Sequence, residues 1–253
     1  MLKRKPTRLE FKEADDKEEL EQARHRAASA AVPSAAAGSS GGSTGGGPTT
    51  PQGNVFRPKI TLKLPSPEAH EKVASALSAF HEVTHMQENV FFDGANTELS
   101  SKRAVLRLRF YDGDGKCVVT FKGNAVIVDG ISRGEELEED IDVSLGRACV
   151  AEPWRLTTTG SNLLNKIVAD YGCKDFVCLG GFRNVRNVFN WEGLKIELDE
   201  TQYDFGTTYE VECESTDPER VRQLLGDFLK SRGIGYIYST KSKFAVFRSG
   251  KLE

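Results

Sequence analysis

Apolar and polar side chains alternate with a period of two over many short stretches of the chain beyond residue 57. This spacing is typical of strands that have one covered face and one polar face. It predicts strands at 59–64, 90–92, 104–111, 117–122, 133–143, 176–179, 184–191, 194–198, 208–214 and 244–247. Many strands and few helices favour an antiparallel sheet or barrel with helices attached to it.

Three stretches have the spacing of amphipathic helices instead. Residues 68–80 follow Ser66 and Pro67, which are a helix cap and a first-turn proline. Residues 161–171 carry apolar side chains at helical spacing, and residues 218–232 follow Asp217 and stop before Gly233. These three helices are available to cover the apolar faces of the strands.

The first 56 residues differ from the rest in composition. Residues 1–26 are dense in charge, whereas residues 27–56 carry no charged side chain and consist mostly of Ala, Ser, Gly, Thr and Pro. Such a composition cannot bury enough apolar surface to offset the entropy of ordering. The sequence therefore predicts a charged segment at 1–26, a flexible linker at 27–56 and one domain at 57–253.

The overall charge excludes some function classes. The 253 residues include 34 basic and 37 acidic side chains, a net charge of −3, whereas general nucleic-acid binders have a basic excess. No apolar run approaches the ~20 residues of a membrane span. The five cysteines form no CxxC pair, which favours reduced thiols. We therefore expect no nucleic-acid partner, no membrane partner, and a cytoplasmic or nuclear location.

The polar faces of several strands carry charges of a single sign. Arg107 and Arg109 share one face of their strand, while Glu210, Glu212 and Glu214 share a face of another. Further rows hold Lys195, Glu197 and Asp199, and Glu136, Glu138 and Asp140. A face exposed to water usually mixes signs, because like charges directly opposite each other are destabilising. We therefore expect these rows to turn inward, where they would hold a polyanion and divalent cations.

Several motifs occur in a consistent order along residues 58–253. They are Gln87–Asp93, Arg103–Phe110, Gly130–Arg133, Phe176–Phe182, Asn184–Val188, Leu198–Glu200, Tyr203–Gly206 and Lys243–Lys251. With these motifs the domain resembles the CYTH superfamily, the triphosphate tunnel metalloenzymes, and most closely the plant members of that superfamily. The resemblance implies an α+β fold with a closed, eight-stranded antiparallel barrel, or tunnel, and flanking helices.

The resemblance also implies a function and a set of site residues. The expected reaction is hydrolysis of a linear triphosphate, most directly inorganic tripolyphosphate, with Mg²⁺ or Mn²⁺ as cofactor. The implied substrate-binding residues are Arg107, Arg109, Lys122, Arg133, Arg186 and Lys243. The implied metal ligands are Glu210, Glu212 and Glu214, and the implied catalytic residues are Lys63, Glu136 and Glu138.

The first strand departs from the family pattern. The family carries a Glu-x-Glu-x-Lys motif there, which aligns either with Lys59, Thr61 and Lys63 or with Arg57, Lys59 and Thr61. Both metal-binding glutamates are missing in either register, and the residues that replace them repel or ignore a divalent cation. The alternative function is therefore a catalytically impaired module that binds polyphosphate or a nucleotide.

Residues 1–26 carry a second resemblance. The basic run from Lys3 to Arg8 and the acidic stretch from Asp15 onward resemble the start of the smallest cell-division-cycle subunit of the anaphase-promoting complex. This implies an extended segment that binds a groove of a TPR-repeat subunit and orders on binding. A second alternative is therefore a structural subunit of that ubiquitin ligase, with a role in the cell cycle.

Overall fold

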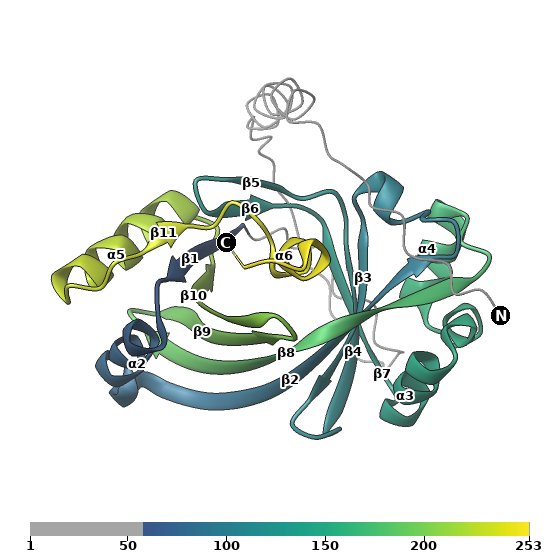
Figure 1. Ribbon diagram of the computed structural model, residues 1–253, viewed down its shortest axis with the longest axis horizontal. Coiled ribbons are helices and arrows are strands. Elements are labelled where there is room, and N and C mark those ends of the chain that lie inside the picture. Colours follow the sequence, from purple (N-terminus) through teal and green to yellow (C-terminus); the bar gives the residue numbers. More distant parts are fainter. Residues whose placement is uncertain (1–57, 253) are drawn as a thin grey trace, which may run out of the picture. The chain divides into compact units, whose positions relative to one another are not determined.

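The computed structural model describes residues 58–252, which form an α+β domain around one antiparallel sheet of eleven strands (Figure 1). The hydrogen-bonded order is β5–β6–β1–β10–β9–β8–β2–β3–β4–β7, and β11 also pairs with β1. The charged segment predicted at 1–26 and the linker predicted at 27–56 lie outside the described residues.

The strands are β1 (Lys59–Leu64), β2 (His81–Gly94), β3 (Val105–Tyr111), β4 (Lys116–Lys122), β5 (Val126–Val128), β6 (Ile131–Arg133), β7 (Glu136–Ile141), β8 (Phe176–Trp191), β9 (Leu194–Tyr203), β10 (Gly206–Glu214) and β11 (Ile237–Tyr238). The helices are α2 (Pro67–Ala76), α3 (Val143–Ala151), α4 (Asn162–Tyr171), α5 (Pro218–Ser231) and α6 (Lys243–Ser249). Short 3₁₀ turns lie at η1 (Ser78–Phe80), η2 (Ser100–Lys102) and η3 (Pro153–Thr157).

The prediction of a closed eight-stranded barrel is wrong, because the sheet has eleven strands and its order has two ends. The strand predicted at 133–143 is broken: β6 pairs with β1, whereas β7 pairs with β4 at the other end of the sheet. The break contains Gly134, where an added Cβ would lie 2.6 Å from the Cβ of Ala125. The chain turns at this point, so β6 and β7 pair with different strands.

The three predicted helices are confirmed as α2 with η1, α4 and α5. The strand predicted at 244–247 is wrong, because these residues belong to α6. The Ser242 side chain accepts a hydrogen bond from the Ala245 amide at the start of α6, and Gly250 ends the helix in the left-handed conformation. Helix α3, capped by Asp142, replaces the end of a predicted strand.

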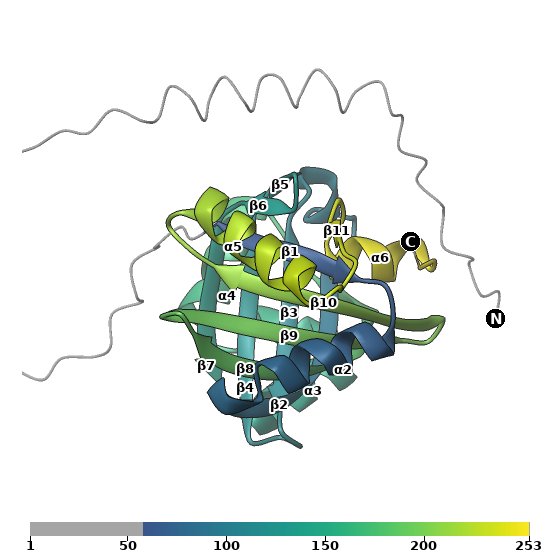
Figure 2. The same ribbon diagram turned by 90° about the vertical axis from the view of Figure 1, so that its left-hand side faces the viewer.

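Apolar cores lie on the outer, convex face of the sheet. Under α2 and α5, one core contains Ile60, Leu198 and Val211, whose neighbours along each strand point the opposite way. A second core, which includes Leu106 and Leu108, packs under α3 and α4. Figure 2 shows α2 and α5 lying across the strands. Because α2, α3, α4 and α5 occupy the convex face, the polar rows are left on the concave face.

Helix α6 lies on the concave side of the curved sheet (Figure 1). Its Phe244 and Phe247 pack against Phe91 of β2, with ring centroids 4.8 and 5.7 Å apart, and Phe182 of β8 completes the cluster. This aromatic cluster fixes the first turn of α6, which carries Lys243, over the concave face. Among residues 58–252, no helix has the length and apolar character needed to cross a bilayer.

Candidate active site on the concave face

The single-sign rows of charge meet on the concave face of the sheet. Thr61 of β1 lies opposite Glu212 of β10, and Glu212 lies opposite Glu197 of β9. Across the sheet, Arg107 of β3 lies opposite Thr120 of β4, which in turn lies opposite Glu138 of β7. Acidic residues thus dominate one wall, formed by β9 and β10, and arginines lie on the other wall.

Three carboxylates of the acidic wall surround a single ammonium. The Lys243 Nζ atom lies 2.9 Å from Asp199 Oδ2, 2.7 Å from Glu210 Oε2 and 2.7 Å from Glu212 Oε1. Although burial lowers the pKa of Lys243, the three carboxylates raise it well above its usual range. The pKa of Glu210 is raised by burial and by the neighbouring charge of Glu212. Negative charge is therefore in excess around this ammonium.

Arg186 of β8 connects the same carboxylates. Its Nε and Nη2 atoms donate to the two oxygens of Asp199 at 2.8 and 2.6 Å, in the bidentate geometry that suits a guanidinium. Nη2 also lies 2.7 Å from Glu212 Oε2, and Nη1 lies 2.5 Å from Glu197 Oε2. Asp199 is fully buried. Its carboxylate can stay ionised there because the guanidinium of Arg186 offsets the cost of removing the charge from water.

Strand β1 adds Lys59 to this wall, at a position where the family pattern has a glutamate. The Lys59 Nζ atom lies 3.1 Å from Glu214, 3.6 Å from Glu212 and 3.8 Å from Glu197. Lys63, predicted to be catalytic, is buried on the same strand opposite Glu210. Lys59 therefore belongs to the site through charge pairing and Lys63 through its register position, while Arg57 lies outside the described residues.

The carboxylate contact of the arginine wall is long, and one of its donors is unpaired. Arg107 Nη2 donates to Thr120 Oγ1 at 2.9 Å, and the same atom lies 3.7 Å from Oε1 of Glu138. The Arg107 Nε atom is buried and has no hydrogen-bond partner within residues 58–252. Burial, followed by the charge of Arg109, lowers the pKa of Arg107 to about 9. An anion between these arginines would accept a hydrogen bond from the Nε atom and would raise the pKa of Arg107.

Lys122 of β4 and Glu136 of β7 pair at the edge of this wall. The Lys122 Nζ atom lies 2.9 Å from Glu136. Burial lowers the pKa of Lys122 to about 8, helped by the charges of Lys59 and Arg107. The charges of Lys122, Lys59 and Arg107 overcome the effect of burial on Glu136 and hold its pKa at about 2. Glu136 is thus ionised at every physiological pH, and Lys122 loses its proton as the pH rises above about 8.

The structure brings most predicted site residues together, with one exception. Arg133 makes its ion pair with Glu219 of α5, 2.7 Å away, outside the network of Arg186 and Lys243. The alternating row predicts that Glu197 and Asp199 turn inward, but the sequence assigned neither of them, nor Lys59, to the substrate-binding, metal or catalytic residues. Their place in the site becomes clear only from their contacts in the fold: Glu197 and Asp199 pair with Arg186, and Lys59 lies near Glu212.

A divalent cation fits the acidic wall on the chemistry of its donors. Asp199, Glu210 and Glu212 already place hard carboxylate oxygens around one positive nitrogen, and such oxygens are what Mg²⁺ and Mn²⁺ prefer. Residues 58–252 contain no ready group of three metal-ligating side chains. The ammonium of Lys243 stands among the carboxylates instead, so a metal would have to replace it or lie beside it.

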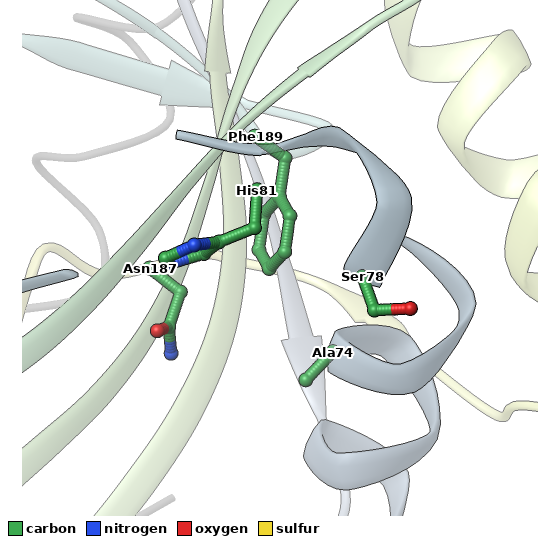
Figure 3. A pocket seen from close by; sticks show the side chains of 5 residues that line it. All are labelled: Ala74, Ser78, His81, Asn187 and Phe189. Atoms are coloured by element: carbon green, nitrogen blue, oxygen red, sulfur yellow. The ribbon is translucent and has the colours of Figure 1, made fainter. Parts of the chain in front are cut away.

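A separate hollow of about 260 Å³ lies at the end of α2, lined by Ala74, Ser78, His81, Asn187 and Phe189 (Figure 3). None of the charged residues described above lines it. Its lining carries no cationic or anionic pair, so it offers nothing that would hold a phosphate chain.

Comparisons with known proteins agree with this geometry. Residues 58–247 match the family model of the CYTH domain, and the chain belongs to the CYTH domain family. A search of curated proteins gave no match. Among solved structures, the chain is 50% identical to the protein HpAC1 from Hippeastrum, with a TM-score of 0.76; the match covers 78% of this chain and 97% of that one. HpAC1 was assigned as an adenylyl cyclase and is described as having a dominant triphosphatase activity.

More distant structures share the fold alone. A protein from Bacillus halodurans, assigned as an adenylate cyclase, is 19% identical with a TM-score of 0.60, over 75% of this chain and 96% of that one. A protein from Pyrococcus horikoshii is 18% identical with a TM-score of 0.52, over 76% of this chain and 99% of that one. These similarities show that the fold of this domain also occurs in these two proteins.

Proposed function

We propose that the domain is a metal-dependent phosphohydrolase that cleaves inorganic tripolyphosphate into pyrophosphate and phosphate. The observation that carries this proposal is the neighbouring pair of Arg107, which is buried and has an unpaired Nε atom, and Arg109, which is half-buried; the wall that they form faces a set of carboxylates. A linear triphosphate carries oxygens for the arginines along its length, and its terminal phosphoryl group can reach the acidic wall. The triphosphatase activity described for the 50% identical Hippeastrum protein supports this assignment.

The basic residues of both walls would hold the substrate. Arg107, Arg109 and Lys122 provide donors from β3 and β4, while Arg186 and Lys243 provide donors from the opposite side. Guanidinium groups suit phosphate oxygens because they donate two parallel hydrogen bonds. Fixing three phosphoryl groups in this way orients the terminal one for in-line attack by water.

The carboxylates would hold the metal and orient water. Asp199, Glu210 and Glu212 are the residues best placed to bind Mg²⁺ or Mn²⁺, which supplies charge neutralisation for the phosphoryl group during transfer. Glu138 is half exposed and accepts a hydrogen bond from Thr120 at 2.9 Å. Its second carboxylate oxygen is therefore placed to accept a proton from a water molecule, while the ionised Glu136 keeps Lys122 in position.

The direct test is phosphate release from tripolyphosphate by residues 57–253, with and without Mg²⁺ or Mn²⁺. Wild type should turn over only with metal. Arg107→Met combined with Arg109→Met should abolish turnover, while Arg183→Met, which changes an exposed arginine of β8, should not. Absence of phosphate release by the wild-type protein with either metal would contradict the proposal.

A catalytically impaired binding module is the second candidate, and the position of Lys59 favours it. The Lys59 ammonium among Glu197, Glu212 and Glu214 opposes entry of a metal at this end of the acidic wall. This candidate predicts that calorimetry detects tight binding of tripolyphosphate or a nucleotide without any turnover. Restoring acidity with Lys59→Glu should then start phosphate release.

We propose further that residues 1–26 bind a TPR-repeat subunit of the anaphase-promoting complex. The support is the resemblance of this segment to the start of a small subunit of that complex. The test is a pull-down of the TPR subunit by the full chain and by a chain that lacks residues 1–26. Equal recovery by both chains would count against this role.

A further inference from the structure

Asn89 of β2 is a buried polar residue that the predicted site does not include. It lies opposite Arg109 in the β2–β3 ladder, and only 1% of its surface is exposed. The side-chain Oδ1 of Asn89 accepts a hydrogen bond from Arg109 Nε at 2.9 Å. Asn89 therefore belongs to the arginine wall and contacts one of its two arginines directly.

The arginine fixes which way the Asn89 amide points. A guanidinium only donates hydrogen bonds, so the amide must turn its oxygen toward Arg109 and its Nδ2 away from it. The Nδ2 atom is buried and has no hydrogen-bond partner within residues 58–252. Buried amide donors are nearly always paired, because leaving one unpaired costs free energy. This donor therefore needs an acceptor from a ligand or water.

A second donor of the same wall is in the same condition. The Arg107 Nε atom is buried without a partner, and Arg107 lies two residues from Arg109 on β3. The unpaired donors of Asn89 and Arg107 lie on adjacent strands, beside the guanidinium groups of Arg107 and Arg109. A ligand with acceptor oxygens would pair with these donors. Phosphoryl oxygens provide such acceptors and carry the matching charge.

The choice of an amide at this position has a physical reason. An aspartate could hold Arg109 Nε equally well, but its negative charge would cancel that of the guanidinium and repel a polyanion. A neutral amide holds Arg109 in place, leaves its charge available and adds a donor. Arg109 is also held by Tyr111, whose hydroxyl accepts from Nη1 at 3.2 Å.

We propose that Asn89 is a substrate-binding residue, which donates its Nδ2–H to a phosphoryl oxygen beside Arg107 and Arg109 and keeps the charge of Arg109 available. This assignment rests on the proposed function, since it takes the ligand to be a linear triphosphate. It adds a neutral hydrogen-bond donor to a set of binding residues that otherwise consists of arginines and lysines.

The experiment compares Asn89→Ala and Asn89→Asp for tripolyphosphate affinity by titration calorimetry, and for stability by urea unfolding without ligand. We expect about tenfold weaker binding for the alanine variant, from one lost hydrogen bond. We expect about a hundredfold weaker binding for the aspartate variant, since a charged contact is also lost. Asn187→Asp, on the β8 residue that contacts Thr84, is the control and should bind like wild type.

The order of affinities separates this role from a purely structural one. If Asn89 only held Arg109 in place, aspartate would hold it at least as firmly, and N89D would bind as well as N89A or better. That order, or wild-type affinity in N89A, would overturn the proposal. Should N89D not fold, N89A still tests the proposal, because wild-type affinity in that variant would overturn it. If wild type itself fails to bind tripolyphosphate, the proposed function fails. If wild type binds and the Asn89 variants bind equally well, only the Asn89 assignment fails.

Discussion

The Nζ atom of Lys243 lies 2.7 Å from Oε2 of Glu210, which joins the first turn of α6 to the middle of β10. The carboxylates of Glu212 and Asp199 contact the same ammonium, which therefore neutralises part of a buried acidic cluster. Because α6 also packs through Phe244 and Phe247, its position and the charge balance of the site depend on each other.

Removing this ammonium should destabilise the protein and expose a place for metal. Lys243→Met should lower the free energy of unfolding by ~3 kcal/mol, because it leaves buried carboxylates without their cation. Millimolar Mn²⁺ should restore more stability to this variant than it adds to wild type, since the metal no longer competes with an ammonium. Urea unfolding with and without Mn²⁺ measures both effects.

Lys251→Met, at the exposed end of the chain, is the matched control and should behave like wild type. Equal stabilisation of wild type and the Lys243 variant by Mn²⁺ would show that the metal does not compete with the ammonium.

The lysine of β1 should limit metal affinity. Lys59→Glu replaces a cation near Glu197, Glu212 and Glu214 with a carboxylate, and should strengthen Mn²⁺ binding by about tenfold. Electron paramagnetic resonance of unbound Mn²⁺ measures this affinity directly. Lys230→Glu on the exposed side of α5 makes the same charge change away from the site, so a similar gain there would point to a general charge effect.

Alkaline pH should weaken substrate binding through Lys122. Burial lowers its pKa to about 8, so the free site loses this positive charge as pH rises above 8. Lys122→Arg keeps its proton, and the ratio of its tripolyphosphate affinity to that of wild type should increase between pH 7 and 9.5. Calorimetry at several pH values gives this ratio, in which the ionisation of the ligand cancels. A ratio that stays constant would show that Lys122 does not titrate in this range.

The same pKa shift has the opposite consequence for the ligand-free fold. Between pH 8 and the ordinary lysine value of 10.5, the unfolded chain binds more protons at this position than the folded chain does. The contribution of Lys122 to stability therefore rises with pH in that window. Comparing the pH dependence of urea unfolding for wild type and Lys122→Arg checks this direction.

Gly181 should be intolerant of any side chain. A Cβ there would lie 1.8 Å from the backbone oxygen of Asn89, so β2 and β8 could not keep their spacing. Gly181→Ala should destabilise the protein by ~1–3 kcal/mol and weaken tripolyphosphate binding, because the Asn89 donor moves. Thermal unfolding and calorimetry measure the two effects. Gly235→Ala, where an added Cβ meets nothing within 4 Å, should change neither.

Local patterns predicted some elements well and others poorly. The alternation at Arg107 and Arg109 gave β3 correctly, and the cap at Ser66 gave α2. Residues 244–247 were predicted as a strand because three of the four are large and apolar, yet Ser242 and Gly250 cap a helix there. Strand β8 was predicted as two pieces, because Gly180 and Gly181 interrupt its pattern, although a bulge carries the strand through them.

The sequence by itself determined which charged side chains share a face, because alternation along a strand depends only on neighbouring residues. It could not determine which strands lie opposite one another. The contact of Lys59 with Glu212 and the position of Lys243 among three carboxylates join segments that are distant in the chain. The unpaired donors of Asn89 and Arg107 can be recognised only from their surroundings in the fold. These groups meet on one buried surface because the sheet is curved and because helices cover its convex face. Both are properties of the tertiary structure.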